Sequence, residues 1–334
     1  PKLTKIFHTV GAGHYVFQHT GNFFQHHGSA MDYFMYFCSP TNIDSHTTSM
    51  KNILVRAASG AIYVGLIVAS IVWGKGYAYP LLCALLGALA VMEFNRISLG
   101  APQSRSRRVL LGLDVAGCVL AIAGITLGII GPRESQFVFS LCLPPAFLYL
   151  IVRPVAQLYV TDSSDSIRSL TTSLGGYVYI SIPLICSGLL YKANPGILLA
   201  LFIMIWCNDT GAYLSGITMG RHKLFERISP KKTWEGFFGG MVFCTAAAAV
   251  CHLLFTGHLE FHDDIALWNI MLLGVTVSIV ATWGDLVESL LKRSAHIKDS
   301  GHIIPGHGGI LDRIDSLLLV MPWALLWLAL TNCF

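Results

Sequence analysis

Charged residues are scarce in this sequence. Asp, Glu, Lys and Arg make up 12% of its 334 residues, whereas hydrophobic residues make up 54% and the mean hydropathy is +0.62. Water-soluble domains carry about twice that share of charge. The composition therefore excludes an ordinary soluble protein, and it predicts an all-α integral membrane protein, a polytopic bundle of helices.

The spacing of the cysteines excludes two further classes of protein. The nine cysteines form no C-x-x-C pair and lie mostly inside apolar segments. We therefore expect them to be small core residues, and neither a zinc site nor a disulfide framework is indicated.

The first 49 residues differ from the rest. They contain neither an apolar run of spanning length nor the basic and apolar pattern of a signal peptide. From Met50 onward, a basic flank runs into an apolar segment, as at an ordinary start. We interpret residues 1–49 as an N-terminal extension that is non-native or poorly ordered, and residues 50–334 as the membrane-embedded domain. The alternative is a genuine cytoplasmic or interfacial segment.

Nine apolar segments are long enough, or nearly so, to cross a hydrocarbon core about 30 Å thick. They are residues 53–73, 78–97, 109–131, 137–152, 174–191, 196–217, 236–256, 266–291 and 314–331. With these spans, almost every basic residue after Met50 falls on one side, and only Lys75, Arg133 and Lys192 fall on the other. Because short basic loops stay in the cytoplasm, this side is predicted to be the cytoplasmic face of the cell (inner) membrane.

Ionisable residues inside two of these spans point to a functional site, because charge is costly there. Asp209 lies near the end of the sixth span. Asp285, Glu288, Ser289 and Lys292 follow one another at i, i+3, i+4 and i+7 in the eighth, so a helix turns them onto one face. The alternative is an ion pair of Asp285 or Glu288 with Lys292 that only holds helices together.

A glycine-rich segment follows, with Gly301, Gly306, Gly308 and Gly309. Its bare backbone N–H groups suit phosphate oxygens, and hard carboxylate ligands suit Mg²⁺ shared with a phosphate. The cations nearby are Lys292, Arg293, Lys298 and Arg313, and the acids are Asp285, Asp299, Asp312 and Asp315. This combination predicts metal-assisted phosphoryl or nucleotidyl transfer at a membrane surface.

A second basic segment, GRHKLFERISPKKTWEG, begins at Gly220. Ser229 and Pro230 read as a turn, and Thr233 is available to cap the next helix. Lys231 and Lys232 suit a triphosphate or a lipid phosphate. For Arg221 and its neighbours, a topological anchor without substrate contact is an equal alternative. Glu93 is ambiguous and could pair with Arg56 or Arg96.

The pattern resembles the phosphatidate cytidylyltransferase (CDP-diacylglycerol synthase) family. The resemblance rests on S-x-x-K-R-x4-K-D-x-G from Ser289 and on PGHGGILDRID from Pro305. It continues upstream through the DT-x-AY run at Asp209 and SPKKTWEG from Ser229, and covers about residues 50–334. The first 49 residues have no counterpart in that family.

The resemblance implies a multi-pass enzyme that condenses CTP with phosphatidic acid to give CDP-diacylglycerol and pyrophosphate, with Mg²⁺ required and a two-cation site expected. It supports Asp285 and Asp312 as metal ligands, followed by Asp315 and Asp209. Ser289 would position an oxygen, and His307 would contact phosphate or only shape the loop. The substrate phosphates would be held by Lys292, Arg293, Lys298, Lys231, Lys232, Arg221, Gly308 and Gly309.

Two other classes of function are compatible with parts of the pattern. A CTP-dependent polyprenol or phytol kinase would use the same nucleotide on a lipid alcohol. A transporter of anionic solutes would need charges along the whole path, whereas here they cluster at one end. The expected partners are CTP, phosphatidic acid and membrane lipid, without nucleic acid, and a homodimer is one option. Acyl chains are expected to lie in a lateral groove between apolar helices.

Overall fold

The computed structural model of this chain describes residues 58–74, 76–130, 136–160, 165–255, 267–301 and 308–331. They all belong to one compact unit, Asn52–Phe334. The proposed N-terminal extension and His307 lie outside the described residues.

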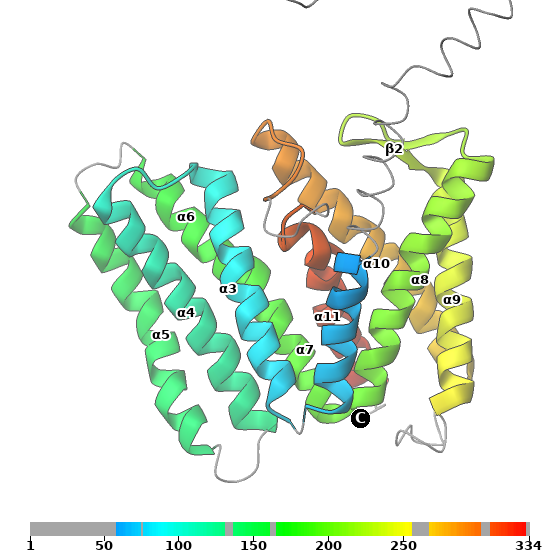
Figure 1. Cartoon of the computed structure of the whole chain (residues 1–334), viewed down its shortest axis with the longest axis horizontal. Helices are drawn as coiled ribbons and strands as arrows, with labels where there is room; N and C mark the ends of the chain where they lie inside the picture. The colour runs from blue at the N-terminus through cyan, green and yellow to red at the C-terminus, as the bar shows by residue number, and fades with distance from the viewer. Residues whose placement is uncertain are drawn as a thin grey trace, which may run out of the picture. The chain divides into compact units, whose positions relative to one another are not determined.

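The described residues are almost entirely helical (Figure 1). The first helix is Ala58–Val72. The elements that follow are α3 (Ala78–Leu99), α4 (Arg105–Ile130), α5 (Gln136–Leu158), α6 (Ser166–Gly176), the π-helical turn η2 (Tyr177–Ser181), α7 (Ile182–Ala193), α8 (Pro195–Met219), β1 (Lys223–Phe225), β2 (Ser229–Thr233), α9 (Trp234–Phe255), α10 (Leu267–Ser294) and α11 (Leu311–Leu330). Because α6, η2 and α7 form one continuous helix, each of the nine predicted spans has its helix.

Seven of the described helices are long and apolar enough to cross a membrane. The segment Ala58–Val72 and the apolar part of α5, Ala146–Leu158, are shorter. Large apolar side chains such as Leu81, Val242 and Leu253 are more than half exposed on the outer faces, which fits contact with lipid tails. The chain is a multi-pass, all-α membrane protein, as its composition predicts.

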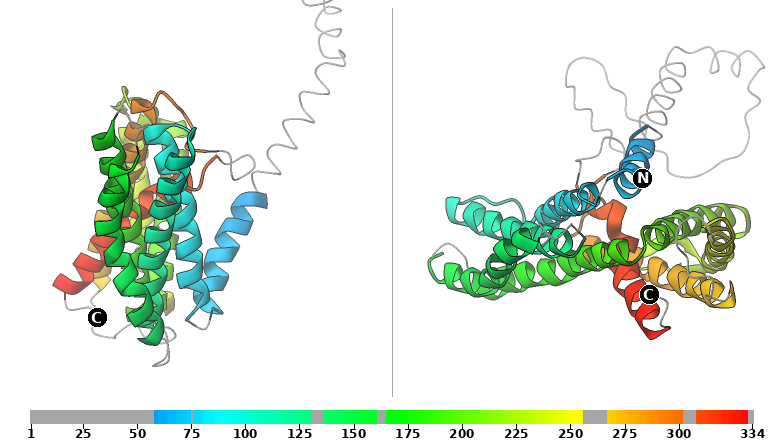
Figure 2. Two further views of the ribbon diagram at one scale, coloured as in Figure 1. Left: turned by 90° about the vertical axis from the view of Figure 1, so that its left-hand side faces the viewer. Right: turned by 90° about the horizontal axis from the view of Figure 1, so that it is seen from below.

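The helices form two groups that are joined through the middle (Figures 1 and 2). In one group α4 packs against α3 and α5, and in the other α9 packs between α8 and α10. The helices α7 and α11 link the groups, since α7 contacts α4 and α11, and α11 contacts α10. The side chains of Leu184, Leu201 and Leu318 are almost fully buried at these contacts.

Small residues allow the helices to approach one another closely, as is common in membrane bundles. A Cβ atom added to Gly211 of α8 would lie 2.6 Å from Phe243 of α9. On Gly284 of α10, it would lie 2.7 Å from the Asp315 carbonyl oxygen of α11. The second contact matters for function because it brings the acidic residues of α10 and α11 together.

A short β-hairpin corrects the expected loop between α8 and α9. Strands β1 and β2 pair antiparallel, with Phe225 opposite Ser229. Ser229 and Pro230, predicted as a turn, begin the second strand, and the turn lies at residues 226–228. Pro230 is tolerated because a two-stranded ribbon has free edges that need no N–H donor. Thr233 caps α9 as predicted, accepting a 3.1 Å hydrogen bond from the Gly236 N–H.

The hairpin marks one end of the bundle, shared by the end of α10 and the start of α11 (Figure 1). The end of α3 and the starts of α4 and α6 lie there too. Among the described residues, the basic side chains that the sequence placed on one side lie in or beside these segments, except Arg153 of α5. Lys192 ends α7 at the opposite end of the bundle. The described helices therefore preserve the predicted asymmetry of charge.

A buried polar network that the sequence analysis did not anticipate ties α4, α5 and α6 together. The Arg153 Nε atom lies 2.7 Å from Asp114 Oδ1, and both side chains are at most 2% exposed. Tyr149 and Ser173 also donate to Asp114, at 2.9 and 2.8 Å. Arg153 is one of the basic residues that the charge asymmetry assigns to the cytoplasmic side, and in the structure it is an internal partner of a buried carboxylate.

Candidate active site

Helix α10 carries the acidic and basic stripe that its sequence predicts. The Ser289 hydroxyl donates a 3.2 Å hydrogen bond to Asp285 Oδ1. One turn further along, the Lys292 ammonium group forms an ion pair with Glu288, whose side chain is fully buried. The four side chains thus share one face, and the ion pair of Glu288 with Lys292, which the sequence analysis left as the structural alternative, is present.

Lys292 also reaches across to α11. Its Nζ atom lies 2.6 Å from Asp312 Oδ1, so one ammonium group serves two carboxylates. All three side chains are at most 13% exposed. Burial of charge is costly, and removal of the shared cation would leave two carboxylates uncompensated. The contact is therefore more than the pair within one helix that the sequence suggested.

Asp285 pairs with the hairpin. Lys232 of β2 places its Nζ atom 2.8 Å from Asp285 Oδ2, and both side chains are partly exposed. The neighbouring Lys231 is exposed, as expected for alternate residues along a strand. Lys232 of the hairpin thus contacts the acidic and basic face of α10, whereas Lys231 is exposed at the surface.

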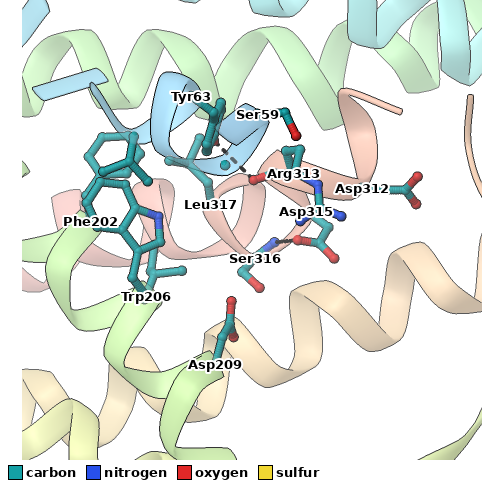
Figure 3. A pocket seen from close by; sticks show the side chains of 13 residues that line it. Ser59, Tyr63, Phe202, Trp206, Asp209, Asp312, Arg313, Asp315, Ser316 and Leu317 are labelled. Carbon is teal, nitrogen blue, oxygen red and sulfur yellow. Dashed lines mark hydrogen bonds between the residues drawn. The ribbon is translucent and has the colours of Figure 1, made fainter. Parts of the chain in front are cut away.

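A cavity of about 230 Å³ lies beside this stripe, between the first helix, α8 and α11 (Figure 3). Its apolar wall includes Phe202, Trp206 and Leu317. Its polar wall includes Asp209 and Asp315. Ser59, Tyr63, Asp312, Arg313 and Ser316 contribute the other labelled side chains in Figure 3. The cavity is therefore amphipathic, with carboxylates at one side and hydrocarbon at the other.

Three carboxylates from three helices share this region. Asp209 of α8, Asp285 of α10 and Asp315 of α11 lie close enough for their charges to repel one another, with Lys232 as a nearby counterion. Asp209 and Asp315 face a common space in Figure 3, whereas Asp312 points away from it. The structure thus groups three of the four predicted metal ligands and places the fourth against Lys292.

Asp312 instead binds the described residues on either side of the glycine-rich segment, Ser300 and Gly309. Its Oδ2 atom accepts hydrogen bonds from the Ser300 N–H at 3.1 Å, the Ser300 hydroxyl at 3.0 Å and the Gly309 N–H at 2.9 Å. Gly308 adopts a φ of +83°, a conformation that favours glycine. The Gly309 N–H, predicted to bind phosphate, is thus turned toward a carboxylate.

The donor chemistry of the three grouped carboxylates suits Mg²⁺, which prefers hard oxygen ligands. Their mutual repulsion also favours a cation between them. In the positions described, however, no three acidic, histidine or cysteine side chains converge on a single ion. The lysine side chains occupy two of the carboxylates, Asp285 and Asp312. The three carboxylates fit the metal by chemistry and charge, and in the structure one of them, Asp285, is paired with Lys232.

The remaining predicted cations lie around the site. Arg293 donates to the backbone carbonyl oxygens of Ile228 and Ile297, each at 3.3 Å, so it links α10 to the hairpin. Lys298 is exposed. Arg221 is also exposed, and its backbone N–H donates to Glu235 at 3.1 Å. Their predicted contacts with substrate stay predictions.

Sequence reasoning missed the roles of Tyr63 and Glu93. Tyr63 lines the cavity, and its hydroxyl donates to the Arg313 carbonyl oxygen at 3.2 Å. The sequence left Glu93 ambiguous, with Arg56 or Arg96 as possible partners, and the structure shows that its carboxylate accepts backbone N–H groups at the start of α11. In the sequence, Glu93 is recognisable only as an acidic residue inside an apolar span, and this position does not predict which groups it contacts.

Comparison with known proteins identifies the family of this chain. The profile of the cytidylyltransferase family matches residues 54–331. Proteins named phosphatidate cytidylyltransferase from Staphylococcus saprophyticus and Staphylococcus haemolyticus are 47% and 48% identical over 121 residues. One from Staphylococcus aureus is 50% identical over 123 residues. Each match covers 36% of this chain and 44% of the relative, less than half of its length. The family profile spans nearly all of the bundle, and the chain therefore belongs to the cytidylyltransferase family.

Proposed function

We propose that this protein transfers the cytidylyl group of CTP to phosphatidic acid, which gives CDP-diacylglycerol and pyrophosphate. The observation that carries the proposal is that Asp209, Asp285 and Asp315 lie close enough to interact electrostatically, two of them on an amphipathic cavity, with Lys232 paired to Asp285 and Lys292 paired to the neighbouring Asp312. The relatives named phosphatidate cytidylyltransferase support it. Such an enzyme would act in phospholipid biosynthesis.

The reaction needs no covalent intermediate on the protein. An oxygen of the lipid phosphate attacks the α-phosphorus of CTP and forms a new P–O bond. The bond from that phosphorus to the oxygen bridging to the β-phosphate breaks, and this oxygen leaves with pyrophosphate. The attacking oxygen is already ionised, so the protein has to align two anions and neutralise their charge.

The lysines are suited to that task. Lys232 and Lys292 come from different elements, β2 and α10, and approach the acidic region from two directions. In the proposed reaction each exchanges its carboxylate partner for phosphate oxygens, with which an ammonium group forms strong charge-assisted hydrogen bonds. Ser289, which is bound to Asp285, then orients that carboxylate.

Asp209, Asp285 and Asp315 are the residues that would hold Mg²⁺, with Asp312 behind them at Lys292. When bound, the ion supplies positive charge for the triphosphate and the departing pyrophosphate. The three carboxylates position that charge at the cavity wall. A site for two cations is proposed, as the family resemblance implies.

The apolar wall of the cavity is proposed to receive the lipid. Phe202 and Leu317 lie on the same cavity as Asp209, so an acyl chain can remain among apolar side chains while its phosphate reaches the acids. The site is proposed to face the cytoplasm from the cell membrane, because the basic residues gather at the same end.

The position of a radiolabel tests the proposal. Purified protein is supplied with phosphatidic acid vesicles, Mg²⁺ and CTP labelled in either the α or the γ phosphate. The proposed reaction puts the α label into lipid and the γ label into pyrophosphate. A CTP-dependent lipid kinase would put the γ label into lipid when a polyprenol is supplied. Folded protein that transfers neither label would refute the proposal.

A further inference from the structure

Glu93 of α3 is a buried carboxylate outside the group of acids described above. Its side chain is 4% exposed and lies far in sequence from the site. Oε1 accepts a 2.9 Å hydrogen bond from the Ile310 N–H, and Oε2 accepts a 2.8 Å bond from the Leu311 N–H. Helix α11 begins at Leu311, and its N-cap residue Ile310 provides no side-chain cap. Glu93 therefore supplies the missing cap from another helix, where a negative charge is favourable.

The same carboxylate also binds Ser300, which directly precedes the glycine-rich segment. The Ser300 hydroxyl lies 3.0 Å from Glu93 Oε2 and also 3.0 Å from Asp312 Oδ2. One hydroxyl hydrogen is thus placed between two carboxylates. Because Asp312 binds Lys292 at 2.6 Å through its other oxygen, a continuous chain of contacts runs from Glu93 to the lysine of the site.

Glu93 leaves no room for a side chain at Gly301 or at Gly309. A Cβ atom on Gly301 would lie 2.6 Å from Glu93 Oε1, and the three atoms nearest to it all belong to the Glu93 side chain. A Cβ atom on Gly309 would overlap the Glu93 carboxylate and the Ser300 hydroxyl. The glycines at these two positions are therefore required for the close approach of a carboxylate.

We propose that Glu93 is a positioning residue of the reaction. It fixes the start of α11 and the segment around Ser300 so that Asp312 and Lys292 are held in register with the acids of the cavity. Glu93 does not touch substrate. The inference rests on the proposed function for its catalytic consequence, but its structural part can be measured without any turnover.

The first test compares Glu93→Gln with Asp114→Asn. Both changes neutralise a buried carboxylate in a hydrogen-bonded network, but Asp114 contacts neither α11 nor the glycine-rich segment in the described structure. Because small misplacements of reacting groups can lower rates by about 100-fold, Glu93→Gln is expected to lower kcat per folded molecule by about 10-fold or more. The KM for CTP should change much less. Asp114→Asn should lower Tm with kcat per folded molecule unchanged.

The second test is a double-mutant cycle read by hydrogen exchange at residues 298–301 and 308–311, together with Tm. Gly301→Ala and Glu93→Ala are each expected to speed exchange there. In the double variant the clash is gone, so its exchange and Tm should match those of Glu93→Ala alone. Additive effects would overturn the inference, as would wild-type kcat in Glu93→Gln or an equal kcat loss in Asp114→Asn. If the wild type transfers no cytidylyl group, the proposed function fails, and the cycle still decides the role of Glu93.

Discussion

At the scale of single residues, two lysines organise the site, because each forms an ion pair with a carboxylate on a different secondary-structure element. Lys292 joins α10 to α11, and Lys232 joins the hairpin to α10. The two ion pairs differ in burial, since the Lys292 side chain is 13% exposed and that of Lys232 is 25% exposed. Their loss should therefore have different consequences for stability and for activity.

Replacement of Lys292 by methionine is expected to destabilise the fold strongly. It would leave the buried carboxylates of Glu288 and Asp312 without their cation, which costs about 3–5 kcal/mol for a buried pair. Thermal unfolding in detergent measures the effect. The control is Lys231→Met, an exposed lysine, for which a change within about 0.5 kcal/mol is expected. Equal shifts for the two variants would contradict this account of Lys292.

Lys232→Gln is expected to separate activity from stability. The pair with Asp285 is partly exposed, so its loss should cost less than about 1 kcal/mol of stability. Loss of a cation from the reacting phosphates should lower kcat by about 100-fold, similar to the loss of one donor to a developing anion. Lys223→Gln, on the exposed face of β1, is the matched control. Near-normal turnover by Lys232→Gln would remove this lysine from the mechanism.

At the scale of elements, the helices are far more predictable than the parts that join them. The apolar segments identify each helix because length and hydropathy are properties of one segment. The hairpin was missed because its pairing depends on contacts between Lys223–Phe225 and Ser229–Thr233 that alternation of polarity does not mark. The sequence places Asp285, Glu288, Ser289 and Lys292 on one face, but it cannot say that Asp285 turns to Lys232.

The hairpin is expected to depend on Arg293. Its guanidinium group donates to the Ile228 carbonyl oxygen in the turn of the hairpin and to Ile297 beyond α10. Arg293→Ala should therefore increase hydrogen exchange across residues 223–233. Arg227→Ala removes an exposed arginine of the same turn and should leave that exchange unchanged. Protection that survives in Arg293→Ala would show that other contacts hold the hairpin.

At the scale of the whole molecule, the proposed chemistry depends on helices that are distant in sequence. Asp209, Asp285 and Asp315 come from α8, α10 and α11, which pack around one another. Composition and basic residues predict a bundle with one basic end, but they do not give the neighbours of α11. Glu93 shows this limit, because its partners lie more than 200 residues away. The prediction that Asp312 is a metal ligand together with Asp285 followed from the family resemblance, whereas the structure pairs Asp312 with Lys292.

The most direct test of the central claim is the initial rate of CDP-diacylglycerol formation from CTP, phosphatidic acid and Mg²⁺ in vesicles, measured per folded molecule. The wild type is compared with Asp285→Asn and with Asp114→Asn, a buried carboxylate remote from the site. The account predicts Mg²⁺-dependent synthesis by the wild type and by Asp114→Asn, and a loss of at least about 100-fold in Asp285→Asn. Comparable synthesis by folded Asp285→Asn would contradict the claim that the carboxylates beside this cavity carry the reaction.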